Sequence, residues 1–94
     1  MVDPNIQAVD EIEQVLKEFP VGEINREATK RIEQALFKIR SADGYTLTKC
    51  GEVRVWAEIF YSRSKHKKHG GPERALHFLR CSLLSLRQAL VHSA

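Results

Sequence analysis

The stretch GPERALHFLRCSLLSLRQAL, residues 71–90, decides the fold because its leucines recur at a helical interval. They follow one another at steps of three, four, three and four, at Leu76, Leu79, Leu83, Leu86 and Leu90. Such a seam is typical of helices packed nearly parallel or antiparallel, at about 20°. Gly71, Pro72 and Glu73 predict the helix start, because proline fits the first position and an acid faces the positive end of the dipole.

Two earlier segments carry matching apolar stripes. Asp3 and Pro4 predict the start of a first helix that Pro20 ends. Its stripe consists of Val9, Ile12, Leu16 and Phe19. A second helix is predicted by Ala28, Ile32, Ala35, Ile39 and Ala42. Asp43 and Gly44 predict its end, since glycine accepts the positive φ of a C-terminal cap.

Residues 45–61, YTLTKCGEVRVWAEIFY, fit two structures. As a helix they turn one apolar face inward, made of Val53, Trp56, Ala57 and Phe60. As a hairpin, β-branched runs pair across a turn at Cys50 and Gly51. We favour the helix, because three helices with matching seams need a fourth to close a core. The sequence therefore predicts an all-α protein, a small antiparallel bundle of three to four helices, with an α+β fold containing a hairpin at 45–61 as the alternative.

Length and composition indicate one domain over residues 1–94, with a basic connector at 62–71. The first fourteen residues are acidic and contain no unbroken apolar run, so we expect neither a signal peptide nor a membrane anchor. Cys50 and Cys81 are interpreted as reduced thiols. We therefore expect a cytoplasmic or otherwise intracellular protein that is not secreted and does not contact a membrane. The sequence contains no glycine-rich nucleotide loop, and we expect no cofactor.

Charge is distributed unevenly along the chain, whose formal net charge is +3. Residues 1–44 contain 6 Lys and Arg against 9 Asp and Glu, whereas residues 45–94 contain 9 against 3. This asymmetry predicts an electrostatic face that serves a polyanion or pairs one copy of the chain with another.

The connector SRSKHKKHGG, residues 62–71, concentrates the positive charge. We expect a flexible connector, whose lysines and arginine can neutralise phosphates and release their counterions. Two glycines would let the backbone approach an anion at the start of the last helix, where N–H groups are free. A tyrosine just before the connector is predicted to offer a surface ring for base stacking. We predict a nucleic-acid or other polyanion site made of Tyr61, Arg63, Lys65, His66, Lys67, Lys68, His69, Gly70 and Gly71.

A protein-interaction or assembly module is the alternative function. The last helix carries more apolar surface than one seam needs, through Ala75, Phe78, Leu84, Ala89 and Val91. A wide apolar stripe indicates central burial or a second contact, most simply a twofold homodimer. In this interpretation the basic connector is only a solvated link.

A metal site is a weaker candidate, and we predict none. His66, His69, His77 and Cys81 are nitrogen and sulfur ligands of the kind that tetrahedral zinc prefers. Their spacing is not that of an established zinc motif, and the neighbouring lysines would repel a dication.

Arg63 and His69 are separated by five residues, a spacing that resembles the motif of the HEPN family of helical ribonucleases. The resemblance covers seven residues, and here the motif lies among lysines, whereas in the family it opens a helix of mixed apolar sequence. It implies that an arginine and a histidine from paired subunits act on RNA. Arg63 and His69 are therefore the catalytic candidates of a third hypothesis, behind two in which the protein has no chemistry of its own.

Overall fold

The computed structural model describes residues 3–41 and 43–92, and these form an all-α protein. Four long helices and one short helix follow in the order α1 (Pro4–Glu18), α2 (Arg26–Lys38), α3 (Gly44–Phe60), α4 (Arg63–Lys68) and α5 (Pro72–His92). The part of the chain that the structure describes contains no strand. The predicted helical bundle is confirmed, and the hairpin alternative at 45–61 is wrong.

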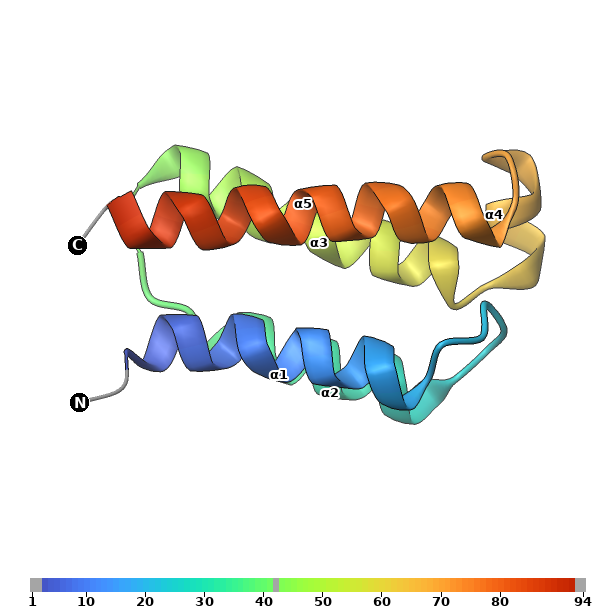
Figure 1. Ribbon diagram of the computed structural model, residues 1–94, viewed down its shortest axis with the longest axis horizontal. Coiled ribbons are helices and arrows are strands. Elements are labelled where there is room, and N and C mark those ends of the chain that lie inside the picture. Colours follow the sequence, from blue (N-terminus) through green and yellow to red (C-terminus); the bar gives the residue numbers. More distant parts are fainter. Residues whose placement is uncertain (1–2, 42, 93–94) are drawn as a thin grey trace.

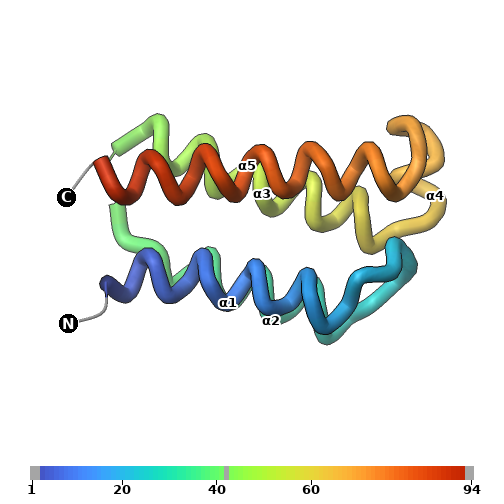
Figure 2. The backbone as a smooth tube through the Cα atoms, viewed as in Figure 1, coloured from blue at the N-terminus to red at the C-terminus, as the bar shows by residue number. Residues whose placement is uncertain are grey.

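Two antiparallel helical hairpins make the bundle (Figure 1). The α1–α2 hairpin lies against the hairpin formed by α3 and α5, and α4 lies in the turn between the last two. α1 contacts α2 and α5, and α3 contacts α2 and α5, so the four long helices enclose one core. The α1–α2 connector and α4 lie at the same end of the bundle, away from the start of α1 and the end of α5 (Figure 2).

Three of the long helices begin at side-chain caps. The carboxylate of Asp3 accepts from the N–H of Asn5 at 2.8 Å, which confirms the predicted start of α1. The side chain of Asn25 caps α2 in the same way. Each cap accepts one of the N–H groups that have no partner inside the first turn of a helix.

The predicted end of the second helix at Asp43 and Gly44 is wrong. α2 ends at Lys38, and Asp43 instead caps α3, where it accepts from the N–H of Tyr45 at 3.0 Å. Gly44 is the first residue of α3 and does not close α2. Aspartate followed by glycine suits either helix end, and the apolar periodicity of the next segment makes it a start here. Ala42 of the predicted stripe lies outside the described residues.

The leucine seam of α5 packs into the core of the monomer. Four of its members are buried, namely Leu79, Leu83, Leu86 and Leu90, while Leu76 is partly buried at the edge of the core. Among the flanking apolar residues, Ala75 is buried, but Leu84 and Val91 are each 57% exposed. The homodimer predicted through this helix therefore stays a prediction that concerns the outer face and not the seam.

Salt bridges join the two hairpins. Arg87 of α5 binds Asp10 and Glu13 of α1, with the Glu13 contact at 2.9 Å. Arg54 of α3 lies 3.9 Å from Glu33 of α2. Pairs this exposed contribute up to about 1 kcal/mol each. Some of the excess cations in residues 45–94 therefore pair with acids in residues 1–44 and stabilise the contact between the two hairpins.

Among the described residues, every helix is too short or too polar to cross a lipid bilayer.

Candidate functional site

The basic connector is helical over most of its length. Six residues predicted to lie in a flexible connector form a short helix, α4, at whose start the carbonyl of Ser62 accepts from the N–H groups of Lys65 and His66. The prediction of a flexible connector is wrong for 63–68. The short helix fixes the directions in which its cations project.

His66 anchors α4 to the other hairpin. Its side chain is 6% exposed, and Nε2 lies 2.7 Å from the carbonyl oxygen of Gly22 in the α1–α2 connector. A carbonyl only accepts, so Nε2 carries the proton and donates. Nδ1 is buried and has no hydrogen-bond partner among the described residues. The predicted surface role of His66 is wrong, because its ring belongs to the packing of the bundle.

Tyr61 is also an anchor and not a surface ring. It is 3% exposed, and its hydroxyl donates to the carbonyl of Phe19 at 2.8 Å. Burial raises the pKa of Tyr61 to about 12, so the phenol keeps its proton and remains a donor. The predicted stacking role is wrong, because α3 ends at Phe60 and the next residue turns toward the α1–α2 connector.

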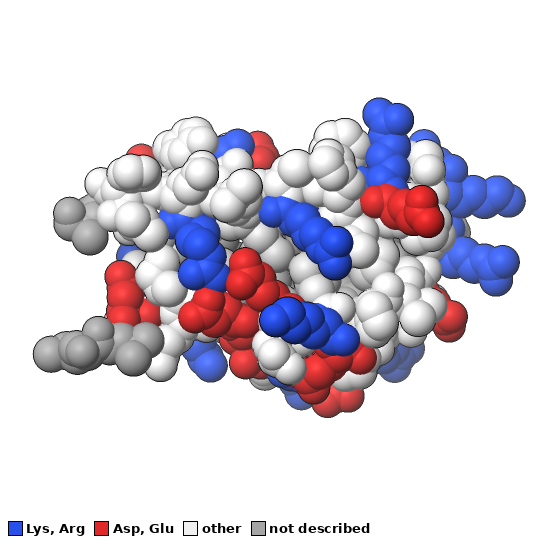
Figure 3. All heavy atoms as spheres, viewed as in Figure 1, with Lys and Arg blue, Asp and Glu red and all other residues white. Residues whose placement is uncertain are grey.

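Four cations occupy the rest of the surface of α4. Arg63, Lys65, Lys67 and Lys68 are exposed, and none forms an ion pair with any residue that the structure describes. Blue side chains project from this end of the molecule, whereas red ones gather over the α1–α2 half (Figure 3). The end of the bundle that α4 forms therefore carries four cations that have no ion pair among the described residues.

The two glycines after α4 both have positive φ, +92° at Gly70 and +97° at Gly71. The N–H of Gly71 donates to the carbonyl of His66 at 2.8 Å and closes the C-terminus of α4. Pro72 has no N–H to offer. The predicted contribution of the Gly71 N–H to an anion seat is therefore wrong, because that N–H is already engaged, while the contribution of Gly70 stays a prediction.

An aromatic and cationic cluster lies beside α4, between α3 and α5. Trp56 stacks on Phe78 with ring centroids 4.8 Å apart, and His69 meets the indole edge-on at 5.8 Å. The guanidinium carbon of Arg74 lies 5.4 Å from the centre of the Phe78 ring. The cluster lines a shallow depression of about 430 Å³, made by Trp56, Lys68, His69, Gly70, Arg74 and Phe78.

The sequence alone did not identify this cluster. The apolar stripe predicts Trp56 in the core, yet its side chain is only partly buried at the surface. The sequence predicts Phe78 only on the outer apolar face of the last helix and indicates no role for Arg74. Of the predicted site, Arg63, Lys65, Lys67, Lys68, His69 and Gly70 remain at the exposed end, and two further groups, Trp56 and Arg74, join them.

Gly70 makes room for Arg74. A Cβ at position 70 would lie 2.5 Å from Cδ of Arg74, whereas a Cβ at Gly71 would meet nothing within 4 Å. The missing side chain therefore allows the arginine to lie across the loop toward Phe78.

The candidate metal ligands do not assemble. His77 and Cys81 lie close, with Nε2 and Sγ 3.6 Å apart. His66 points into the bundle, and no three His, Cys, Asp or Glu side chains in the described ranges are placed to hold one ion. Arg63 and His69, the candidate catalytic pair, lie at opposite ends of α4, about 9 Å apart along its axis. The HEPN-like hypothesis requires a second subunit and stays a prediction.

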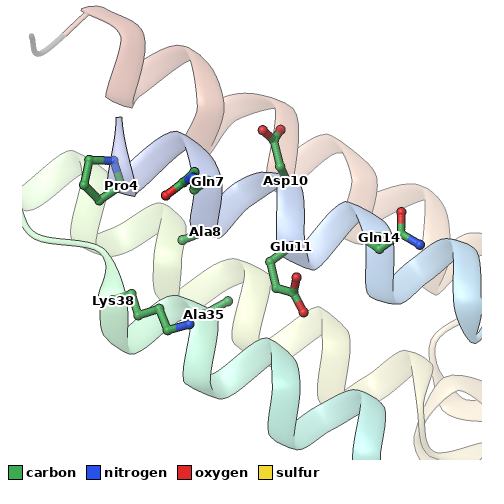
Figure 4. A pocket seen from close by; sticks show the side chains of 8 residues that line it. All are labelled: Pro4, Gln7, Ala8, Asp10, Glu11, Gln14, Ala35 and Lys38. Atoms are coloured by element: carbon green, nitrogen blue, oxygen red, sulfur yellow. The ribbon is translucent and has the colours of Figure 1, made fainter. Parts of the chain in front are cut away.

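A larger depression, of about 720 Å³, lies over α1 and α2 (Figure 4). Its two carboxylates point to different sides of α1 (Figure 4). Glu11 accepts from Arg31 at 2.8 Å, and Asp10 is bound by Arg87. Both acids are engaged in the packing of the bundle, so this surface is a weaker candidate than the α4 end.

The fold and the site define a small up-and-down helical bundle with a basic, partly aromatic end. Comparison with models of protein families, with curated proteins and with solved structures finds no match to this chain.

Proposed function

We propose that the protein is an intracellular helical module that binds nucleic acid at the α4 end of the bundle. The basic end, as we call this surface, consists of Arg63, Lys65, Lys67, Lys68 and Arg74. The observation that carries the proposal is the presence, on six residues of helix, of four exposed cations that form no ion pair within 3–41 and 43–92. A chain of phosphates is the ligand that matches so dense a positive charge.

Three arginines elsewhere in the bundle are already paired, whereas Lys30, Lys38 and Arg40 have no ion pair in the described structure but are not gathered on one short helix. Arg31, Arg54 and Arg87 each contact two carboxylates, so a phosphate would have to displace an existing partner. The cations of α4 require no such exchange. The anchored His66 also fixes the short helix on the bundle, which reduces the ordering cost when its side chains bind.

The triple substitution Lys65→Gln, Lys67→Gln, Lys68→Gln is expected to weaken binding to a single-stranded oligonucleotide by about 10²-fold near 0.1 M salt. The estimate follows from a salt slope of about −0.7 for each phosphate neutralised on a single strand. The same variant should show a salt slope that is shallower by about 2. Fluorescence anisotropy across a range of salt concentrations measures both quantities.

A charge-matched control removes three cations from the other hairpin. Lys30→Gln, Lys38→Gln and Arg40→Gln also change exposed residues without ion pairs in the described structure. This control should change affinity and slope far less than the α4 variant does. Equal losses in the two variants would mean that net charge alone, and not the basic end, attracts the ligand. A wild-type affinity that does not depend on salt would overturn the proposal.

A second prediction distinguishes the contribution of Arg74 to binding from the effect of backbone strain at the two glycines. Gly70→Ala and Gly71→Ala each place a side chain at positive φ, which should cost about 1 kcal/mol of stability in both variants. Only Gly70→Ala also pushes Arg74 away from the loop. Gly70→Ala should therefore bind several-fold more weakly than Gly71→Ala at similar stability, measured by anisotropy and urea denaturation. Indistinguishable affinities would remove Arg74 from the basic end.

A further inference from the structure

Trp56 and Phe78 form a stacked aromatic pair that is partly exposed at the surface, where large apolar side chains are often part of a binding site. Both rings are only partly buried, and they stack on each other at the same end of the bundle as α4. Lys68 and Arg74 line the depression that the two rings share. Its volume, about 430 Å³, lies in the range of sites that hold small ligands, roughly 300–1,000 Å³.

We infer that the basic end selects single-stranded over duplex nucleic acid, because an unpaired base stacks against Trp56 and Phe78. The inference rests on the proposed function and names the ligand class of that site. Aromatic rings flanked by cations are the common means of binding single strands, with bases on the rings and phosphates on the charges. Lys68 and Arg74 are the two Lys or Arg residues that line the depression, so they are placed to meet the phosphates beside such a base.

Duplex nucleic acid cannot use this depression in the same way. The faces of its bases are covered by their neighbours, so stacking on protein rings requires a base to leave the helix first. A phosphate backbone without bases meets only the cations. The rings therefore add affinity for base-bearing single strands alone, about 5- to 150-fold for each stacked base.

His69 and Arg74 contact the stacked rings of Trp56 and Phe78. His69 meets the edge of the indole, and Arg74 lies near the Phe78 ring because Gly70 leaves it room. Both act as positioning residues for the stacked pair. Their positions depend on the turn that Gly71 closes onto His66.

The chain contains a single tryptophan, so intrinsic fluorescence reports on this depression without a label. The intact protein is titrated with a single-stranded oligonucleotide of about twelve nucleotides, its duplex, and an abasic strand of equal length. We expect the base-bearing single strand to quench Trp56 and to bind about 5- to 150-fold more tightly than the abasic strand. The duplex and the abasic strand should bind in a salt-dependent manner and leave the fluorescence unchanged.

Phe78→Leu keeps the reporter and removes half of the stacked pair. This variant should bind the single strand several-fold more weakly and the abasic strand as the wild type does. Phe37→Leu changes an aromatic ring that is 78% exposed and lies outside the depression, and it should alter neither affinity.

The outcomes separate the inference from the proposed function. Equal, salt-dependent binding of single strand and abasic strand, with Trp56 unchanged, overturns the inference and leaves the basic end as a phosphate-binding surface. Tighter binding of the duplex without quenching does the same. Failure of all three ligands to bind at low salt overturns the proposed function together with the inference.

Discussion

Replacing Phe60 with alanine is expected to lower the free energy of unfolding by about 3–5 kcal/mol, the largest effect of any change considered. Phe60 is 1% exposed and is the largest of the fully buried side chains. Its ring packs at 4.8 Å from that of Tyr61, beside the connector of the other hairpin. Truncation leaves a cavity between both hairpins, and a small domain has only about 5–15 kcal/mol of stability to lose. Urea denaturation followed by circular dichroism measures the change.

Phe37→Ala is the matched control, since it removes the same atoms from a ring that is 78% exposed. Its stability should stay within about 0.5 kcal/mol of the wild type. Similar losses in the two variants would contradict the packing of α3 described above.

Gly22→Val is expected to destabilise the protein by about 2–5 kcal/mol through two effects. A Cβ at this position would lie 2.9 Å from Cβ of Pro72 and 3.1 Å from the carbonyl oxygen of Phe60. Both are rigid neighbours, so the connector has to move away. The carbonyl of Gly22 then leaves the buried Nε2 of His66 without its acceptor.

The same change should weaken nucleic-acid binding, because α4 is anchored through that hydrogen bond. Gly51→Val is the control, since a Cβ at Gly51 in α3 meets nothing within 4 Å. Valine has a somewhat better helix propensity than glycine, so the control should stay within about 0.5 kcal/mol of the wild type. If Gly22→Val kept wild-type stability and affinity, the α1–α2 connector would not support the basic end. Urea denaturation and anisotropy on the same preparations test both statements.

The long helices could be predicted because their signals are local. Asp3 and Pro4 mark the start of α1, and the leucines of α5 mark one face of a helix, whatever the rest of the chain does. The helical state of 44–60 followed from the need to close a core. The predicted boundary at Asp43 is wrong, because the same residue pair suits the end of one helix and the start of the next.

α4 could not be predicted, because nothing local favours it. Four like charges within six residues repel one another, and isolated helices this short are unstable in water. The helix forms against the bundle, through a histidine that reaches Gly22, 44 residues earlier in the chain. Histidine among lysines gives no sequence signal for burial.

The aromatic pair gives no local signal in the sequence. Trp56 lies four residues before the end of α3, and Phe78 lies six residues after the start of α5. Because these distances differ and α4 lies between the two helices, counting positions from the turn does not predict the contact. The predicted surface position of Tyr61 is wrong because this residue follows the end of α3, where helical periodicity no longer indicates which side chains are buried.

The most direct test of nucleic-acid binding at the basic end is a titration of the ¹⁵N-labelled protein with a single-stranded oligonucleotide, followed by ¹H–¹⁵N NMR. We predict that the amides of 63–71 and of Arg74, together with the indole N–H of Trp56, shift most, and that Lys30 and Lys38 hardly shift. Perturbations centred on α1 and α2, or none at all at low salt, would contradict the account.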